Sequence, residues 1–282
     1  MLSANRRDVV ASQIGMPPPS TTGGRPIWRA VAVPSEHGGW GLTLEPVLLG
    51  LLLAFSWSGL AVGVAAFLAF LVRTPLKIAL GDLRRHRSLK RTKVATRFAV
   101  GELVAIVGLG LAVLLTAGGE WLWPVAVAAP LIGIELWFDV RSRGRRLVPE
   151  LCGAVGIASV AAAIVVVGNG DARLAIAAWM ILVARSLAAV PFVRTQIVRL
   201  RRGTAPLRTT DGFQALGALL AAGAVAIEAS TVFGGIAVAL LAAAHVVWLR
   251  RPVPPAKVLG LRQMVIGFSV VGATAIGVLT IG

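Results

Sequence analysis

Charged residues inside long apolar runs are the first candidates for chemistry in this sequence. Arg73 and Lys77 are four residues apart, and Asp82 follows them. Glu135 and Asp139 are also four apart, a spacing that places two side chains on one face of a helix. Two such carboxylates could act as base and acid or hold a divalent cation, whereas Arg and Lys suit an anionic group. The alternative is a set of ion pairs that serves only the structure.

Single acids elsewhere add to this group. Glu45 and Glu102 each stand within an apolar run, where an unpaired carboxylate is costly or binds a proton. Each is therefore expected to meet a basic residue such as Arg73, Lys77 or Arg185. Such pairing would either hold the structure together or place charge at a binding site, and the sequence leaves both open.

Two histidines are candidates for proton transfer or ligand binding. His37 stands just before the first apolar run, and we group it with Asp82, Glu135 and Asp139 as candidate catalytic residues. His245 lies within an apolar run, where it could bind haem iron, although a polar contact between helices is the ordinary role of such a residue. The sequence contains no phosphate-binding loop, zinc-ligand set or nucleophile elbow.

The composition shows which elements must position these residues. Of 282 residues, 57% are hydrophobic and 14% are charged, and the mean hydropathy is +0.83. Roughly a quarter of the residues of a soluble domain are charged, so we predict an all-α, polytopic membrane helical bundle. Continuous apolar runs favour helices over a β-barrel. We place nine transmembrane helices at about 41–56, 59–80, 97–117, 121–139, 149–168, 172–190, 211–228, 231–249 and 258–281.

The basic residues indicate how this bundle is oriented. With nine spans, all but one of the 28 Lys and Arg residues fall on one side, and the exception is Arg173. Because cytoplasmic loops carry the positive excess, we predict an inner-membrane protein with a cytoplasmic N-terminus and an outside C-terminus. Residues 1–33 are expected to form a disordered tail before a single transmembrane domain over 34–282. The net charge of +16 then fits membrane lipids with anionic headgroups and not nucleic acid.

An internal similarity suggests two related halves. Residues 70–74 read Phe-Leu-Val-Arg-Thr, residues 192–195 read Phe-Val-Arg-Thr, and Leu-Arg-Arg follows both. The two segments are four predicted helices apart. An even number gives two parallel four-helix repeats, related by an axis near the membrane normal, with Arg73 and Arg194 in equivalent positions. Chance similarity between Arg-rich helix ends is the alternative.

The start of the first apolar run carries a family resemblance. Residues 34–40 read PSEHGGW in one-letter code, and Glu45-Pro46 follows within the predicted helix. This pattern resembles the opening of the bacterial YwiC-like integral membrane protein family, which typically begins with Pro-x-Glu-His-Gly-x-Trp before a proline-containing helix. The length and hydropathy of the chain are also similar. The resemblance implies a multi-pass membrane protein and brings no established activity with it.

A more distant resemblance is to the UbiA-type intramembrane prenyltransferases. Those enzymes have nine helices, a cavity on the cytoplasmic side, and acidic motifs after the second and sixth helices that hold magnesium against a prenyl diphosphate. Here the first motif retains only Asp82 and the second at most Asp211. The resemblance implies a UbiA-like fold and an isoprenoid or lipid phosphate ligand. Magnesium is possible but disfavoured, and we assign no metal ligand.

These features lead to one leading hypothesis and two alternatives. The first is a UbiA-like membrane-embedded protein that binds a lipid-soluble substrate by its phosphate-like head and could act as a transferase. Arg73, Lys77, Arg185 and Arg194 would hold the head, with Glu45 beside them. The alternatives are a transporter or lipid-handling protein without chemistry, and a structural accessory subunit of a membrane complex. The sequence does not decide whether the protein is an enzyme.

Overall fold

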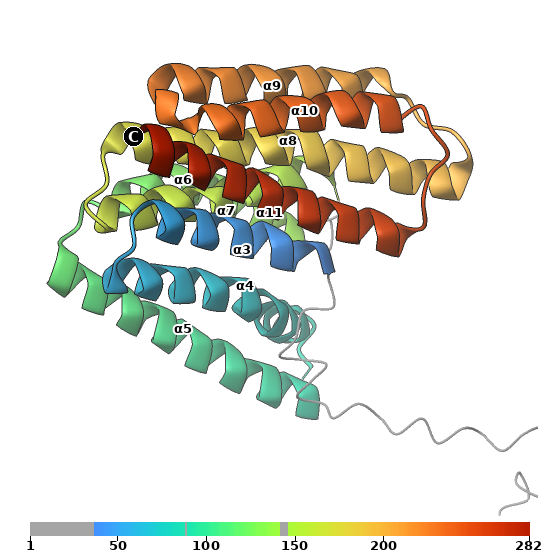
Figure 1. The fold of residues 1–282 in the computed structure, drawn as a ribbon. Helices are drawn as coiled ribbons and strands as arrows, with labels where there is room; N and C mark the ends of the chain where they lie inside the picture. Colours follow the sequence, from blue (N-terminus) through green and yellow to red (C-terminus); the bar gives the residue numbers. More distant parts are fainter. Residues whose placement is uncertain (1–36, 88, 142–145) are drawn as a thin grey trace, which may run out of the picture.

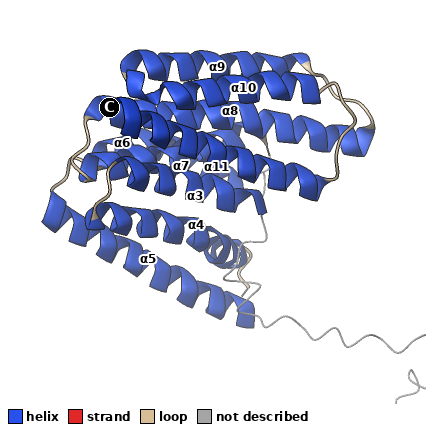
Figure 2. Ribbon diagram, in the orientation of Figure 1, coloured by secondary structure: helices blue, strands red, loops and turns tan. Residues whose placement is uncertain are grey.

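The computed structural model describes residues 37–87, 89–141 and 146–282, and in this part of the chain helices joined by short connections account for the fold (Figure 2). The predicted disordered tail at 1–33 lies outside the described residues. In chain order the elements are α3 (His37–Leu53), α4 (Trp57–Arg84), α5 (Lys90–Ala117), α6 (Leu122–Val140), α7 (Leu147–Val167), α8 (Ala172–Arg202), α9 (Arg208–Ile227), the 3-10 turn η1 (Ala229–Thr231), α10 (Val232–Trp248) and α11 (Ala256–Ile281).

Each predicted span coincides with one of these α-helices, which confirms a polytopic helical bundle. In the described part of the chain, eight helices are long and apolar enough to cross a membrane, and α3 adds a shorter apolar segment, Trp40–Leu53. Three helices, α4, α5 and α8, continue well past the predicted spans into basic sequence. Arg and Lys are good helix formers, so the helix persists where hydropathy no longer marks it.

The helices fall into two halves with α3 between them (Figure 1). In the first half, α4 packs against α5, α6 and α7, and α6 packs against α7. In the second half, α8 packs against α9, α10 and α11, and α10 packs against α11. The same neighbours thus recur four helices later, which supports the predicted repeat. The halves differ in that α9 also packs closely on α10, a contact without an equally close counterpart between α5 and α6.

Small residues fill the centre of the bundle. Ala161, Ala162 and Ala163 on α7 are completely buried. The helix α3 lies so close to α7 that an added Cβ at Gly50 would overlap Ile164, and the glycine therefore permits this close packing. Lipid is as apolar as Leu, so membrane helices associate through such close packing and through polar contacts. By contrast, α5 and α6 leave most of their apolar side chains uncovered, as expected for helices that face lipid.

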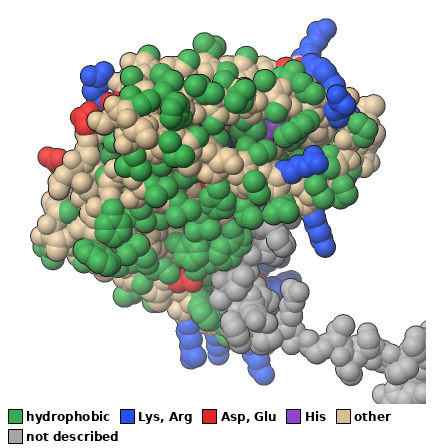
Figure 3. Space-filling model, in the orientation of Figure 1, with side chains coloured by type: hydrophobic (Ala, Val, Ile, Leu, Met, Phe, Trp, Pro, Cys, Tyr) green, Lys and Arg blue, Asp and Glu red, His purple; other side chains and the backbone are tan. Residues whose placement is uncertain are grey.

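One end of the molecule is strongly basic, and we call it the basic end. It is formed by the C-terminal turns of α4, α6, α8 and α10 and the N-terminal turns of α5, α7, α9 and α11. Figure 3 shows most of the visible Lys and Arg side chains there, toward the right of the view. At the other end, Arg173 donates to the carbonyl of Ile227 at the end of α9. The number and length of its apolar helices thus indicate a multi-pass membrane protein. Its location in the inner membrane and the orientation of its termini stay predictions.

Candidate functional site

An ion-pair cluster joins α4 to α6 toward the basic end. Arg73 Nη2 lies 2.7 Å from Glu135 Oε1 and 2.7 Å from Asp139 Oδ2. Lys77 Nζ lies 3.7 Å from Asp139 Oδ1. The structure therefore brings together two residue pairs that the sequence presented separately. We call these four residues the Arg73 cluster.

The spacing along each helix explains how the cluster forms. Arg73 and Lys77 are about one turn apart on α4, and so are Glu135 and Asp139 on α6, so the members of each pair share a face. Gly153 on α7 lies against Glu135, and an added Cβ there would overlap the carboxylate. A glycine at this point is what allows the acid to sit between α6 and α7.

The acids of the cluster are less exposed than its bases. The side chains of Glu135 and Asp139 are each 15% exposed, whereas Arg73 is 32% and Lys77 is 50% exposed. The formal charges balance, but the outward side of the cluster is basic. An anion that approaches it meets the guanidinium and ammonium groups first.

Arg194, the predicted counterpart of Arg73, also meets an acid. Its Nη1 donates to Glu150 Oε2 at 3.4 Å and joins α8 to the first turn of α7. Both side chains are more than a third exposed. An exact repeat would place the partner of Arg194 on α10, so the equivalence of the two arginines stays a prediction.

Glu45 and Arg185 form a second pair, enclosed within the bundle. Arg185 Nη2 on α8 lies 2.7 Å from Glu45 Oε1 on α3, and the side chains are 5% and 2% exposed. The same nitrogen donates to the backbone carbonyl of Gln263 on α11 at 2.8 Å. An added Cβ at Gly267 would overlap both charged groups, so this glycine provides their space. The expectation that Glu45 meets a basic residue is confirmed.

A line of buried side chains continues from this pair through the second half. Gln263 Nε2 lies 2.9 Å from His245 Nε2, and His245 Nδ1 lies 3.2 Å from Gln214 Oε1. Gln214 Nε2 then donates to the carbonyl of Ala188 at 2.8 Å. Polar contacts therefore link α3, α8, α11, α10 and α9. Sequence reasoning missed both glutamines, although an amide within an apolar run is a signal for such a contact.

His245 is a polar contact between helices, as the ordinary reading of its position predicts. Both ring nitrogens contact an amide, and the ring stacks on Phe192 with centroids 3.8 Å apart. The amide oxygen of Gln214 accepts a hydrogen bond and the amide nitrogen of Gln263 donates one, so the contacts fit a neutral ring with its proton on Nδ1. Neither nitrogen is open to a haem iron.

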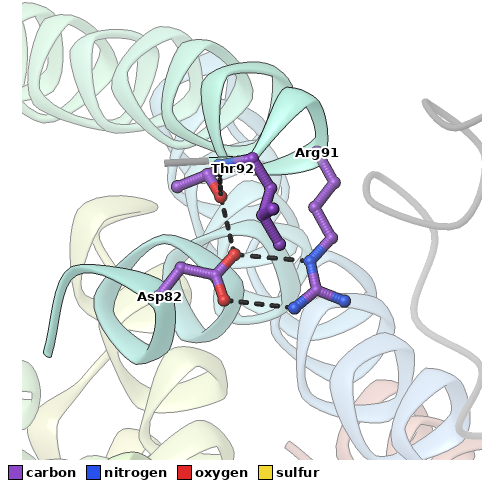
Figure 4. Close-up of polar contacts among 4 residues, drawn as sticks. Asp82, Arg91 and Thr92 are labelled. Carbon is purple, nitrogen blue, oxygen red and sulfur yellow. Dashed lines mark hydrogen bonds and ion pairs between the residues drawn. The ribbon is translucent and has the colours of Figure 1, made fainter. Parts of the chain in front are cut away.

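The two acids singled out by the UbiA resemblance are held by arginines. Asp82 binds Arg91 at 3.1 and 3.3 Å and accepts a 2.6 Å bond from the Thr92 hydroxyl, which ties the end of α4 to the start of α5 (Figure 4). Asp211 binds Arg250 at 2.9 and 3.2 Å. These hydrogen bonds, together with the charge of Asp211, raise the pKa of Arg250.

Two other predicted residues stand apart from the cluster. The expectation that Glu102 meets a basic partner is wrong within the described part of the chain, where its buried Oε2 has no hydrogen-bond partner. The helix α5 packs chiefly against α4, whose Arg73 and Lys77 contact α6 instead. His37 is the first residue of α3, and its side chain lies outside the described residues.

The described residues contain no group of three or more His, Cys, Asp and Glu side chains that could hold a metal ion. In the Arg73 cluster the two carboxylates, Glu135 and Asp139, are both engaged by bases. Mg²⁺ usually binds through one or two carboxylates together with phosphate oxygens, so at this place a ligand phosphate would have to complete its shell.

Comparison with known proteins bears on the first half of the molecule. The family model for YwiC-like protein matches residues 33–165, a range that includes Glu45, the Arg73 cluster and Glu150 but not α8 to α11. No curated protein and no solved structure matches the chain, and the UbiA-like fold stays a prediction. The resemblance drawn from the opening of the first helix is confirmed, because residues 33–165 of the chain are similar to YwiC-like protein.

Proposed function

We propose that this YwiC-like membrane protein binds a lipid-soluble molecule through an anionic, phosphate-like head at the Arg73 cluster. The observation that carries the proposal is the difference in exposure within the cluster. Arg73 and Lys77 are more exposed than the acids that hold them. Arg and Lys presented in this way suit a phosphate, which takes Arg in two parallel hydrogen bonds and Lys as a point charge.

Exposure divides the bases that the sequence suggested for the head. Three of them are about a third exposed or more, so an anion can reach them: Arg73, Lys77 and Arg194. Arg185 and Glu45 are enclosed and form an ion pair with each other, although Arg185 Nε has no hydrogen-bond partner in the described part of the chain. We therefore assign the head to Arg73 and Lys77 of the cluster, treat Arg194 as a separate exposed base, and assign a structural role to the enclosed pair.

Binding at the cluster would be an exchange of partners. A phosphate oxygen that contacts Arg73 replaces Glu135 or Asp139, and the released carboxylate stays next to the bound head. The apolar tail would lie in lipid beside α6, where Ile134 and Leu136 are exposed. Any transferase step would take its base from the released acid, whereas binding or transport needs no such step.

The test compares Arg73→Ala with Arg91→Ala, a control in which an arginine also leaves an ion pair at the end of α4. Lipids that copurify with each variant are identified by mass spectrometry, and thermal stability is measured on the same samples. If Arg73 holds the head, Arg73→Ala lowers affinity by about 2–5 kcal/mol, at least thirtyfold. Its stability falls by only about 1 kcal/mol or less, because its ion pairs are partly exposed.

Arg91→Ala should leave the lipid profile unchanged. Loss of stability in Arg73→Ala with an unchanged lipid profile would show that the cluster only holds α4 to α6, and the proposal would then be abandoned. A depleted lipid in Arg73→Ala, retained in the control, supports it and identifies the ligand.

A further inference from the structure

A small pocket at the basic end lies in the second half of the molecule, away from the Arg73 cluster. It is formed where α8, α10 and α11 meet, and its volume is about 50 Å³. A void needs roughly 10–15 Å³ to hold one water-sized group, so this pocket is large enough to receive a small polar group. None of its lining residues belongs to the proposed binding cluster.

The rim of the pocket carries positive charge that no acid balances. Arg251 and Arg262 both line it and are exposed, and neither forms an ion pair within the described part of the chain. Asp211, the acid nearby, is engaged by Arg250. Arg199 adds a further guanidinium, which donates to backbone carbonyls at the end of α10. The pocket is therefore suited to an anion.

The walls of the pocket are apolar and its inner end is polar. Phe192, Trp248 and Leu259 supply the walls, and the guanidinium of Arg262 lies 6.0 Å from the Trp248 ring. The buried Gln263 closes the inner side and joins the pocket to the line of polar contacts that leads to Glu45. Trp at the end of a membrane helix marks the headgroup level, so the pocket lies where lipid phosphates lie.

The connection between α10 and α11 holds the rim in place. Pro252, Pro254 and Pro255 occur within four positions of it, and two of them line the pocket. Proline fixes the backbone φ angle, so little conformational freedom is left to lose when a ligand binds. A rim that is already ordered favours affinity.

We propose that this pocket is a binding site for the phosphate group of an anionic membrane lipid, contacted by Arg251 and Arg262. Basic pockets between membrane helices at the headgroup level recognise such lipids. The site is separate from the Arg73 cluster, so either proposal can fail without the other.

The experiment separates a built site from a general basic surface. The double variant Arg251→Gln/Arg262→Gln is compared with Lys257→Gln/Arg208→Gln, which removes two exposed charges from the same end without touching the pocket. The full-length protein in detergent is titrated with short-chain phosphatidylglycerol, with zwitterionic phosphatidylcholine, whose choline cation balances its phosphate, and with inorganic phosphate. Thermal unfolding of both variants confirms that they are folded.

If only the general surface charge attracts phosphatidylglycerol, removing two basic residues weakens its binding by roughly thirtyfold in both double variants. If the proposed site exists, the pocket variant loses about tenfold more affinity for phosphatidylglycerol than the control variant does. The affinity for phosphatidylcholine changes in neither variant. Equal losses overturn the pocket site. Inorganic phosphate that binds as tightly as phosphatidylglycerol, with the same dependence on Arg251 and Arg262, overturns the lipid as the source of the phosphate.

Discussion

The enclosed pair of Glu45 and Arg185 gives the sharpest test of how this fold is stabilised. Arg185→Met leaves a buried carboxylate without its cationic partner, and Glu45→Met leaves a buried guanidinium that keeps only the carbonyl of Gln263. Removing one member of a buried pair costs roughly 3–5 kcal/mol, because the remaining charge stays out of water. We expect a loss of this size in each single variant.

The double variant separates a stabilising contact from an unpaired charge. Replacing both members of a buried ion pair by apolar side chains is often neutral or stabilising. Glu45→Met/Arg185→Met should therefore be more stable than either single variant, which requires a coupling energy larger than either single loss of roughly 3–5 kcal/mol. Arg194→Met is the matched control, and it should cost about 1 kcal/mol or less because its pair with Glu150 is partly exposed.

The assay is equilibrium unfolding in mixed micelles with increasing dodecyl sulfate, followed by tryptophan fluorescence. The reasoning is refuted if the double variant is no more stable than the more stable of the two single variants. It is also refuted if the single variants lose no more than Arg194→Met, because burial of the pair would then have no energetic effect.

Two further predictions concern topology and metal dependence. A reporter that is active only outside the cytoplasm should be active when fused after Gly282, because the basic end is expected to face the cytoplasm. Activity of a cytoplasmic reporter at that position instead would show that the number of spans is even. Binding of a lipid head at the Arg73 cluster should survive a chelator, because the cationic groups of Arg73 and Lys77 hold the head in this proposal. A magnesium requirement that Asp82→Asn removes would contradict this and favour the prenyltransferase hypothesis.

The helices themselves could be predicted, because apolar runs long enough to cross a bilayer are continuous in the sequence. Their ends could not, because α8 continues to Arg202 through basic sequence that hydropathy does not mark. The spacing of Glu135 and Asp139 predicted a shared face, but nothing in it showed that Arg73 would bridge them. That requires knowing that α4 packs beside α6.

The contact partners of the buried amides could not be predicted, for a different reason. Gln214 and Gln263 carry no charge, and each lies in a largely apolar helix that also contains other polar residues. Their role depends on His245, which lies on a third helix between them in space. A hydropathy profile records each residue alone, whereas this contact exists only once three helices are in place.

The position of Glu45 also constrains the order in which the protein is built. During synthesis α3 enters the bilayer early, while Arg185 on α8 and Gly267 on α11 are made much later. Until they arrive, the nascent chain carries a carboxylate in the membrane without the arginine and the glycine pocket that receive it. Completion of the bundle therefore waits for α11, and a chain that lost α11 would leave the pair of Glu45 and Arg185 uncovered on the side where Gly267 packs against it.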